Sequence, residues 1–196
     1  MALKLFCALF MVLSMAGFSK EVKDESTGLT FPEKVTIEKD GKTYQLSNTG
    51  VATRRKLIVK VYSIASYLQD GAFKGGDKFA PLLGDEFAKE IIIKFNHDVS
   101  GEKLRASFED ALKSNLSQAD YGSLQQQITQ VLGVFNDVKP GDEYVIRALP
   151  GGYTAILQNG KELSSLTNST FSKALWATWV GPNSVVKRDN LVTNLQ

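Results

Sequence analysis

Few side chains in this chain of 196 residues could carry out chemistry, and their types narrow the choices at once. There is one histidine, His97, and one cysteine, Cys7. A zinc site built from cysteine and histidine needs a cluster of such ligands, so the sequence excludes one, and it also excludes a disulfide within the chain. Any Ser/His/Asp or Cys/His catalytic set would have to use His97. Its place between an expected strand and an expected helix favours an ordinary loop histidine.

The other polar motifs also lack the spacing of a catalytic or cofactor site. Gly75-Gly76 is not a phosphate-binding loop, because no strand precedes it and no Lys-Ser/Thr pair follows it. The acidic residues are scattered, and no pair of carboxylates marks a general acid/base couple. We therefore expect no metal, no cofactor and no catalytic residue in this chain.

The charge balance bears on the class of partner. The chain has 23 Lys and Arg residues against 21 Asp and Glu residues, for a formal net charge of +2, and its basic residues do not form a run. Nucleic-acid-binding domains carry a basic patch or stripe, so we expect no nucleic acid partner.

The first 19 residues have the pattern of a secretory signal peptide. Lys4 precedes an uncharged apolar run from Leu5 to Met15, and small residues follow where a signal peptidase would cut. A buried N-terminal helix is the alternative, but the abrupt change to charged residues after position 19 favours the signal. The run is shorter than the roughly 20 apolar residues that a transmembrane helix needs, and no second such run follows. We expect cleavage near residue 19, a periplasmic or secreted protein with no integral membrane segment, and one domain over residues 20–196.

Hydrophobic periodicity and turn residues predict the elements that must position any site. Alternating apolar residues on both sides of Asp40-Gly41 predict a tight hairpin. Period-2 or buried-looking runs predict further strands over residues 56–68 (one long strand), 88–95, 143–149, 153–158 and 161–163. Helical spacing predicts helices over residues 101–116, 121–135, 171–180 and 185–195, with Ser100 as a cap of the first and Gly181-Pro182 as the end of the third.

This order of elements defines the expected fold class. Antiparallel turns join the strands, and the helices are grouped late in the chain, which indicates an α+β domain with a large antiparallel sheet and helices on one face. Tyr62 and Tyr67 fall on opposite faces of that sheet, so one of them should face the helices. Trp176 and Trp179, three residues apart on a helix, are more typical of a core than of a stacking platform.

The segment from Gly50 to Leu68, with Arg54, Lys60, Tyr62 and Tyr67 inside it, resembles a motif of the chalcone isomerase-like superfamily, specifically of its bacterial exported branch. Further segments resemble the family in the right order: 28–32, 91–95, 139–142, 168–176 and 180–182. The resemblance covers essentially the whole chain after residue 19. It implies an open-faced β-sandwich, in which helices lie on a large antiparallel sheet and a ligand cleft runs between the two layers.

The resemblance also implies where a site would lie. In the plant enzymes of this superfamily, an Arg and a Thr of the sheet, a Tyr, a Lys and an Asn of the first helix, and a late Ser or Thr line the cleft. By position, the catalytic Tyr falls at or near Ser100, with no tyrosine nearby, so the ketone-polarising hydroxyls of the enzymes are missing. The other positions give the candidate ligand-binding residues: Arg54, Tyr62 (at the Thr position), Lys103, Ser107 (at the Asn position) and Ser172.

The combination of Arg54 and Tyr62 resembles the fatty-acid-binding members of the superfamily, in which an Arg and a Tyr hold a carboxylate. A guanidinium and a phenol both donate hydrogen bonds to such a group. The leading hypothesis is therefore a non-catalytic, exported protein that binds a small amphipathic acid, such as a fatty acid. The alternatives are an isomerase acting on a phenolic or enone substrate, and an interaction protein whose cleft is closed by its own side chains.

The distance between Arg54 and Tyr62 depends on the path of the chain. On one straight strand, eight residues span about 26 Å. The two side chains meet only if the chain bends sharply around residues 57–60, and otherwise they stay apart.

Overall fold

The computed structural model describes residues 20–196. The expected signal peptide, residues 1–19, lies outside the described residues.

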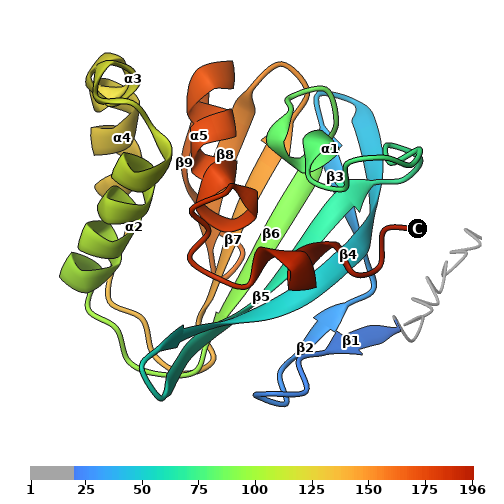
Figure 1. The fold of residues 1–196 in the computed structure, drawn as a ribbon, viewed down its shortest axis with the longest axis horizontal. Helices are drawn as coiled ribbons and strands as arrows, with labels where there is room; N and C mark the ends of the chain where they lie inside the picture. The colour runs from blue at the N-terminus through green and yellow to red at the C-terminus, as the bar shows by residue number, and fades with distance from the viewer. Residues whose placement is uncertain (1–19) are drawn as a thin grey trace, which may run out of the picture.

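Seven strands form one curled antiparallel sheet in the order β3-β4-β5-β6-β7-β8-β9, so each strand pairs with its neighbour in sequence (Figure 1). A separate two-stranded hairpin of β1 and β2 precedes this sheet. The strands are β1 (Glu21–Lys23), β2 (Thr30–Pro32), β3 (Lys34–Lys39), β4 (Lys42–Lys56), β5 (Val59–Gln69), β6 (Lys89–Phe95), β7 (Glu143–Leu149), β8 (Tyr153–Gln158) and β9 (Lys161–Thr167).

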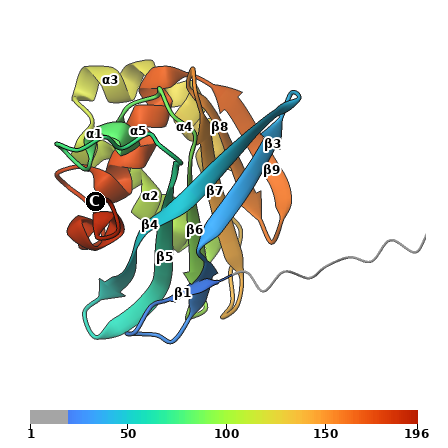
Figure 2. The same cartoon turned by 90° about the vertical axis from the view of Figure 1, so that its right-hand side faces the viewer.

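The main helices cover one face of this sheet, as the two views at right angles show (Figures 1 and 2). They are α1 (Ala80–Leu83), α2 (Gly101–Asn115), α3 (Gln118–Ser123), α4 (Gln125–Leu132) and α5 (Ser169–Val180), followed by a 3₁₀ helix, η1 (Arg188–Val192). Helix α5 packs against α2, and η1 lies along β4. The expected fold class, α+β with helices layered on one face of an antiparallel sheet, is confirmed.

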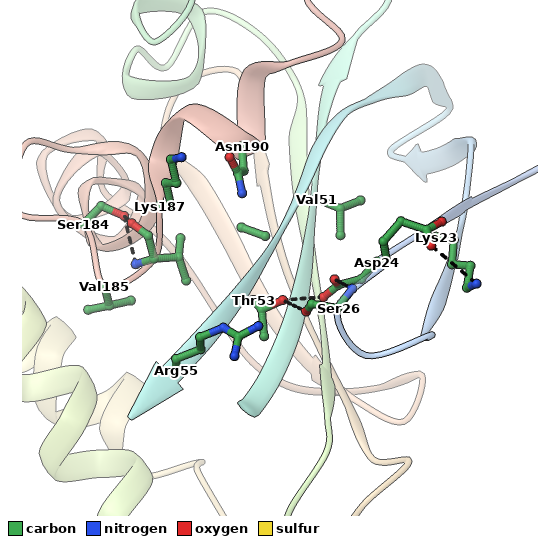
Figure 3. A pocket seen from close by; sticks show the side chains of 13 residues that line it. Lys23, Asp24, Ser26, Val51, Thr53, Arg55, Ser184, Val185, Lys187 and Asn190 are labelled. Carbon is green, nitrogen blue, oxygen red and sulfur yellow. Dashed lines mark hydrogen bonds and ion pairs between the residues drawn. The ribbon is translucent and has the colours of Figure 1, made fainter. Parts of the chain in front are cut away.

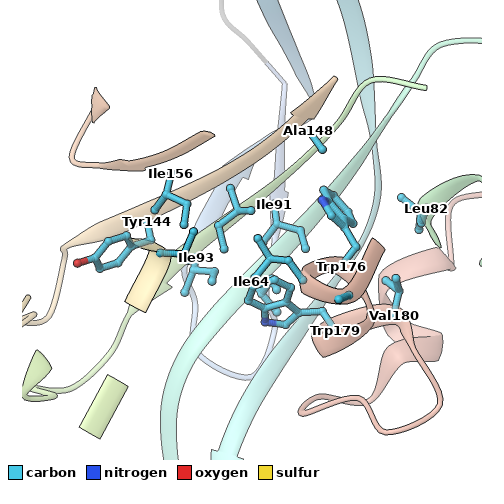
Figure 4. Packing of buried hydrophobic residues seen from close by; sticks show 14 of the residues in the cluster. Ile64, Leu82, Ile91, Ile93, Tyr144, Ala148, Ile156, Trp176, Trp179 and Val180 are labelled. Atoms are coloured by element: carbon cyan, nitrogen blue, oxygen red, sulfur yellow. The ribbon is translucent and has the colours of Figure 1, made fainter. Parts of the chain in front are cut away.

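Each face of the sheet has its own hydrophobic core. On the helix side, Trp176, Trp179 and Val180 of α5 pack over Ile64 and other sheet residues (Figure 4), and both tryptophans are fully buried as expected. On the opposite face, Phe31 of β2 packs with buried residues of β3 to β7. Among the described residues, the sheet thus lies between two hydrophobic cores.

Most of the expected strands are confirmed, but the start of one differs from the prediction in a way that matters. The hairpin around Asp40-Gly41 forms with both turn residues at positive φ, and β7 and β8 have the expected bounds. The strand expected over residues 56–68 forms over most of its length as β5, but its expected start is wrong. The chain turns at Leu57-Ile58, so β4 ends at Lys56 and β5 starts at Val59. The turn contains no Gly, Pro, Asn or Asp, and so it gave no turn signal in the sequence.

The expected helices are also confirmed only in part. Ser100 caps α2, its Oγ accepting a hydrogen bond from the Lys103 amide at 3.4 Å, and α5 ends at Gly181 as predicted. The helix expected over residues 121–135 is two helices that meet at Leu124. The helix expected over residues 185–195 is wrong: the segment contains only the short η1, because its backbone and buried side chains are bound to β4 instead.

Candidate ligand-binding site

Arg54 and Tyr62 are cross-strand partners in the β4–β5 pair. The turn at Leu57-Ile58 brings them opposite each other, so the bent path, and not the straight one, is the path of the chain. Side chains at paired positions lie on the same face of a sheet. Both residues therefore belong to the helix side, and Tyr62 packs edge-on against the Phe95 ring at a centroid distance of 5.7 Å.

The Arg54 guanidinium is half-buried and has no carboxylate partner among residues 20–196. Its Nη1 donates to the Val185 carbonyl oxygen at 2.5 Å. A guanidinium has five N–H donors, so this contact leaves several of them for another acceptor. The backbone carbonyl holds the side chain in place without neutralising its charge.

The Tyr62 hydroxyl can still donate a hydrogen bond. It accepts one from the Trp179 indole Nε1 at 3.3 Å. Burial raises the pKa of Tyr62, and the hydrogen bond from Trp179 and the charge of Arg54 act in the opposite direction. The phenol is therefore protonated at physiological pH, and its O–H is a donor beside the guanidinium.

A cleft of about 440 Å³ opens beside this pair, between the β4–β5 hairpin, α2 and α5. Small-molecule sites typically measure about 300–1,000 Å³. Most of the lining is apolar: Leu57, Val59, Val61, Val99, Leu104, Phe108, Ala111, Trp179 and Val185. The Phe108 and Trp179 rings meet edge-to-face with centroids 5.5 Å apart. The cleft thus joins a cationic group to a mainly apolar chamber.

The structure brings four of the five expected site residues together and leaves one out. Arg54, Tyr62, Lys103 and Ser107 all line this cleft, the last two as exposed residues of α2. Ser172 does not line it. Its side chain is fully buried in the core, and its hydroxyl has no hydrogen-bond partner among the described residues.

The hydroxyl that α5 does offer to the cleft belongs to Thr178, which sequence reasoning missed. Its Oγ1 is buried and has no hydrogen-bond partner among residues 20–196. Thr178 lies six residues after Ser172, about 240° further round the helix, so the two cannot share a face. The position of Thr178 in the last turn of α5, before Gly181-Pro182, was the sequence signal that could have identified this residue. The family pattern alone did not indicate Thr178.

The mouth of the cleft also contains His97 and Asp98, which precede α2. Both are exposed. His97 is the loop histidine that the sequence predicted, and it nevertheless lies at the entrance to the same cavity as Tyr62.

A second cavity, of about 680 Å³, lies along β4 on the far side of Val185 (Figure 3). Arg55 lines this cavity, whereas its neighbour Arg54 lines the cleft. Asp24, at its wall, accepts a hydrogen bond from Thr53 Oγ1 at 2.6 Å. Burial raises the pKa of Asp24, but hydrogen bonds from Thr53, Ser63 and Ser26 outweigh it and hold the pKa below its usual value. The cavity thus combines an ionised Asp24 with the cationic side chains of Lys23, Arg55 and Lys187.

Residues 20–196 contain no group of three or more His, Cys, Asp or Glu side chains that could hold a metal ion. No helix in this part of the chain has the length and apolar character needed to cross a membrane.

The fold and the cleft together define a class of protein: a curled antiparallel sheet under a helical layer, with a mainly apolar cleft that an arginine of the sheet lines. The sequence model described as chalcone isomerase-like matches residues 23–191, and the chain therefore belongs to the chalcone isomerase-like family.

A solved structure has the same fold. The crystal structure of a fatty-acid binding protein from Arabidopsis thaliana superposes with a TM-score of 0.73, over 90% of this chain and 97% of that one, at 14% sequence identity. At this identity the likeness shows the fold alone. None of the curated proteins matches this sequence.

Proposed function

We propose that this protein binds a small amphipathic carboxylate of the fatty-acid kind in the Arg54 cleft, without catalysing a reaction on it. One observation carries this proposal: a half-buried guanidinium with no carboxylate partner among the described residues lines a mainly apolar cleft. A partly desolvated cation is costly unless it is paired. An anionic ligand head group would supply the missing partner.

The donors around Arg54 suit a carboxylate. The guanidinium can present two parallel N–H groups to two oxygens, and the Tyr62 O–H adds a third donor nearby. The Thr178 hydroxyl, unpartnered within residues 20–196, lies in the same cleft. The apolar lining would take the hydrocarbon chain, whose removal from water supplies most of the binding free energy.

The similarity to a fatty-acid binding protein supports this ligand class. The absence of a tyrosine near Ser100, where the plant enzymes of the superfamily carry a catalytic one, supports binding without catalysis. The location belongs to the same proposal. Residues 1–19 have the pattern of a cleaved signal, so the protein would work in the periplasm or outside the cell. N-terminal sequencing of the protein from a cell fraction outside the cytoplasm tests this, and a retained Met1 there would contradict it.

The binding experiment uses native mass spectrometry of residues 20–196, purified without detergent and then incubated with dodecanoate or hexadecanoate. We expect a one-to-one complex whose mass exceeds that of the protein by the mass of the acid. The Arg54→Ala variant should lose about 10- to 100-fold in affinity, since a hydrogen-bonded charge contributes about 1.5–3 kcal/mol.

The matched control is Arg55→Ala. It removes the same side chain from the adjacent position, which lines the other cavity, and should bind the acid like the parent. Equal binding of the acid by the parent and Arg54→Ala would refute the role of Arg54 in holding the carboxylate. A parent that forms no adduct with either acid would refute the ligand class.

A second candidate function is isomerisation of a phenolic enone, and one observation favours it. His97, the only histidine of the sequence, lines the same cleft as the Tyr62 hydroxyl, so a proton-transfer group and a phenol share one cavity. Turnover of a chalcone that His97→Gln abolishes would establish this activity. If the parent shows no turnover but still binds the acid, the isomerase function is refuted and only the binding function remains.

A further inference from the structure

The β4–β5 hairpin ends in two exposed aliphatic side chains. Leu57 is 94% exposed and Ile58 is 92% exposed, and Val59 follows them at the start of β5. They are the large hydrophobic residues of the described chain that stand in solvent. Exposing two adjacent aliphatic side chains costs free energy in water, so their presence at one tip needs a reason.

The requirements of a tight turn do not supply that reason. The β3–β4 and β8–β9 hairpins turn at Asp40-Gly41 and Asn159-Gly160, and all four of these residues have positive φ. These residue types are the ones that tight hairpin turns favour. Leu57 has a φ of 56°, in the left-handed region that a leucine adopts at a cost. Folding would therefore favour Asn or Gly at this position.

The tip lies at the entrance to the cleft. Leu57 and Val59 contribute to its wall, whereas Ile58 does not. In Figure 1 the hairpin reaches the end of the molecule at which the chain enters α2. A surface that received the tip would therefore lie next to the mouth of the cleft.

The charges around the tip are mainly positive. Arg55 and Lys56 precede it and are exposed, and Lys103 stands across the mouth on α2. Asp98 is the one carboxylate among the described residues that line the cleft. An apolar tip with cationic flanks complements a surface with an apolar interior and anionic groups above it.

We propose that this hairpin tip inserts into an anionic lipid surface, with Leu57 and Ile58 at the boundary between head groups and acyl chains and with Arg55 and Lys56 among the head groups. Two side chains on a narrow turn are too few for a stable protein interface, which buries about 800 Å² on each partner. They are enough for a shallow membrane contact that places the cleft mouth at the lipid. The inference goes beyond the proposed function, because docking would occur whether or not Arg54 holds a carboxylate.

The test is co-sedimentation of residues 20–196 with phosphatidylcholine vesicles that contain or lack phosphatidylglycerol. The parent should bind the anionic vesicles and bind the neutral ones weakly. Ile58→Ser, at a position outside the cleft wall, should bind anionic vesicles at least about tenfold more weakly, because a membrane contact gains free energy from buried aliphatic surface. Arg55→Glu should weaken binding to a similar degree.

Lys42→Glu is the matched control for charge, because it makes the same change of sign beside the tip of the β3–β4 hairpin. It should leave vesicle binding near that of the parent. Three results would overturn the proposal: no binding of the parent to anionic vesicles, equal binding by Ile58→Ser, or an equal loss in Lys42→Glu and Arg55→Glu.

A fluorescent label reports insertion directly. Cys7 lies outside residues 20–196, so Ile58→Cys in this segment would carry the only thiol. An environment-sensitive dye at this site should shift to shorter wavelengths with anionic vesicles, and the same dye at Lys42→Cys should not. A label on Ile58→Cys that stays in water while the protein binds would contradict insertion. Arg54→Ala should still dock while it loses acid binding. Unchanged acid binding in this variant, with docking intact, would overturn the proposed function alone.

Discussion

Tyr62 stands directly opposite Arg54 across the β4–β5 hairpin, and the turn between them consists of two aliphatic residues. This pairing places a phenol and a guanidinium, eight positions apart in sequence, on one face of the sheet in the lining of a mainly apolar cleft. The same turn that joins them also forms the exposed tip at the mouth of that cleft. The candidate site and the candidate membrane contact therefore share one hairpin.

Tyr62→Phe tests the role of the phenol. The change removes an O–H donor from the cleft and leaves the Trp179 indole N–H without its acceptor. We expect fatty acid affinity to fall about 2- to 10-fold and stability to fall by about 1 kcal/mol, the usual range for one hydrogen bond. Calorimetric titration and thermal unfolding measure the two effects.

Tyr67→Phe is the matched control for that variant. Tyr67 belongs to the same strand but points to the opposite face, where its hydroxyl donates to the Pro32 carbonyl oxygen at 2.8 Å. It should lose stability to a similar degree and keep the affinity of the parent. A drop in affinity as large as that of Tyr62→Phe would mean that the loss reflects a general loosening of the sheet.

Ser172→Ala and Thr178→Val separate the two hydroxyls of α5. Ser172 is buried in the core with an unpartnered hydroxyl, so its replacement should leave ligand affinity unchanged and stability equal or slightly higher. Thr178 lines the cleft, and its isosteric replacement should lower affinity a few-fold. Competition with a fluorescent fatty acid measures both. A loss of affinity in Ser172→Ala but not in Thr178→Val would instead show that Ser172 belongs to the site.

Periodicity and turn residues predicted the sheet and its face pattern, whereas the cleft residues Arg54, Tyr62, Lys103 and Ser107 were predicted from the resemblance to the chalcone isomerase-like superfamily. Alternation predicted β7 and β8, and Asp40-Gly41 predicted its hairpin. The turn at Leu57-Ile58 escaped prediction because its residues have strand propensity and no turn signal.

The C-terminal segment escaped prediction for a tertiary reason. Residues 185–195 have an amphipathic pattern, but Thr49 Oγ1 donates to the Leu191 carbonyl oxygen and the Asn194 amide donates to the Thr49 carbonyl oxygen. These contacts hold the segment along β4, where tertiary bonding overrides helix propensity. Val185, whose carbonyl holds Arg54, begins this segment and is bonded to α5, where its amide donates to the Thr178 carbonyl oxygen.

Gly50→Ala tests that arrangement. A Cβ at Gly50 would lie 2.1 Å from the carbonyl oxygen of Asn190, so the C-terminal segment would have to move away from β4. We expect a loss of about 1–3 kcal/mol in unfolding free energy, as for other overpacked sites. Gly122→Ala is the control, because a Cβ there meets nothing within 4 Å. Chemical denaturation compares the two, and equal stability would show that η1 does not rest on β4 in this way.

Lys89 predicts a pH dependence of stability. It is fully buried, its amine donates to the carbonyl oxygens of Leu82 and Gly84, and it lies over the Trp176 ring. Burial lowers the pKa of Lys89 to about 7, and the carboxylates of Asp85 and Glu86 only partly offset this effect. The unfolded chain, with an ordinary lysine pKa, then binds one more proton than the folded chain above pH 7.

Stability should therefore rise between about pH 7 and pH 9.5, with a slope of up to about 1.4 kcal/mol per pH unit from this group. Urea unfolding at several pH values measures the slope. Lys89→Met should remove its share of the slope, whereas Lys94→Met, from the opposite face of the same strand, should retain it. Identical slopes for the parent and Lys89→Met would contradict a depressed pKa for this amine.

A crystal structure of residues 20–196 with a bound long-chain fatty acid tests the central claim most directly. The account predicts the carboxylate within about 2.7–2.9 Å of an Arg54 guanidinium nitrogen, the usual length of such a charged hydrogen bond, with the Tyr62 hydroxyl also in contact. The hydrocarbon chain should run along Phe108 and Trp179. A carboxylate bound elsewhere, with Arg54 still bonded only to the Val185 carbonyl, would contradict it.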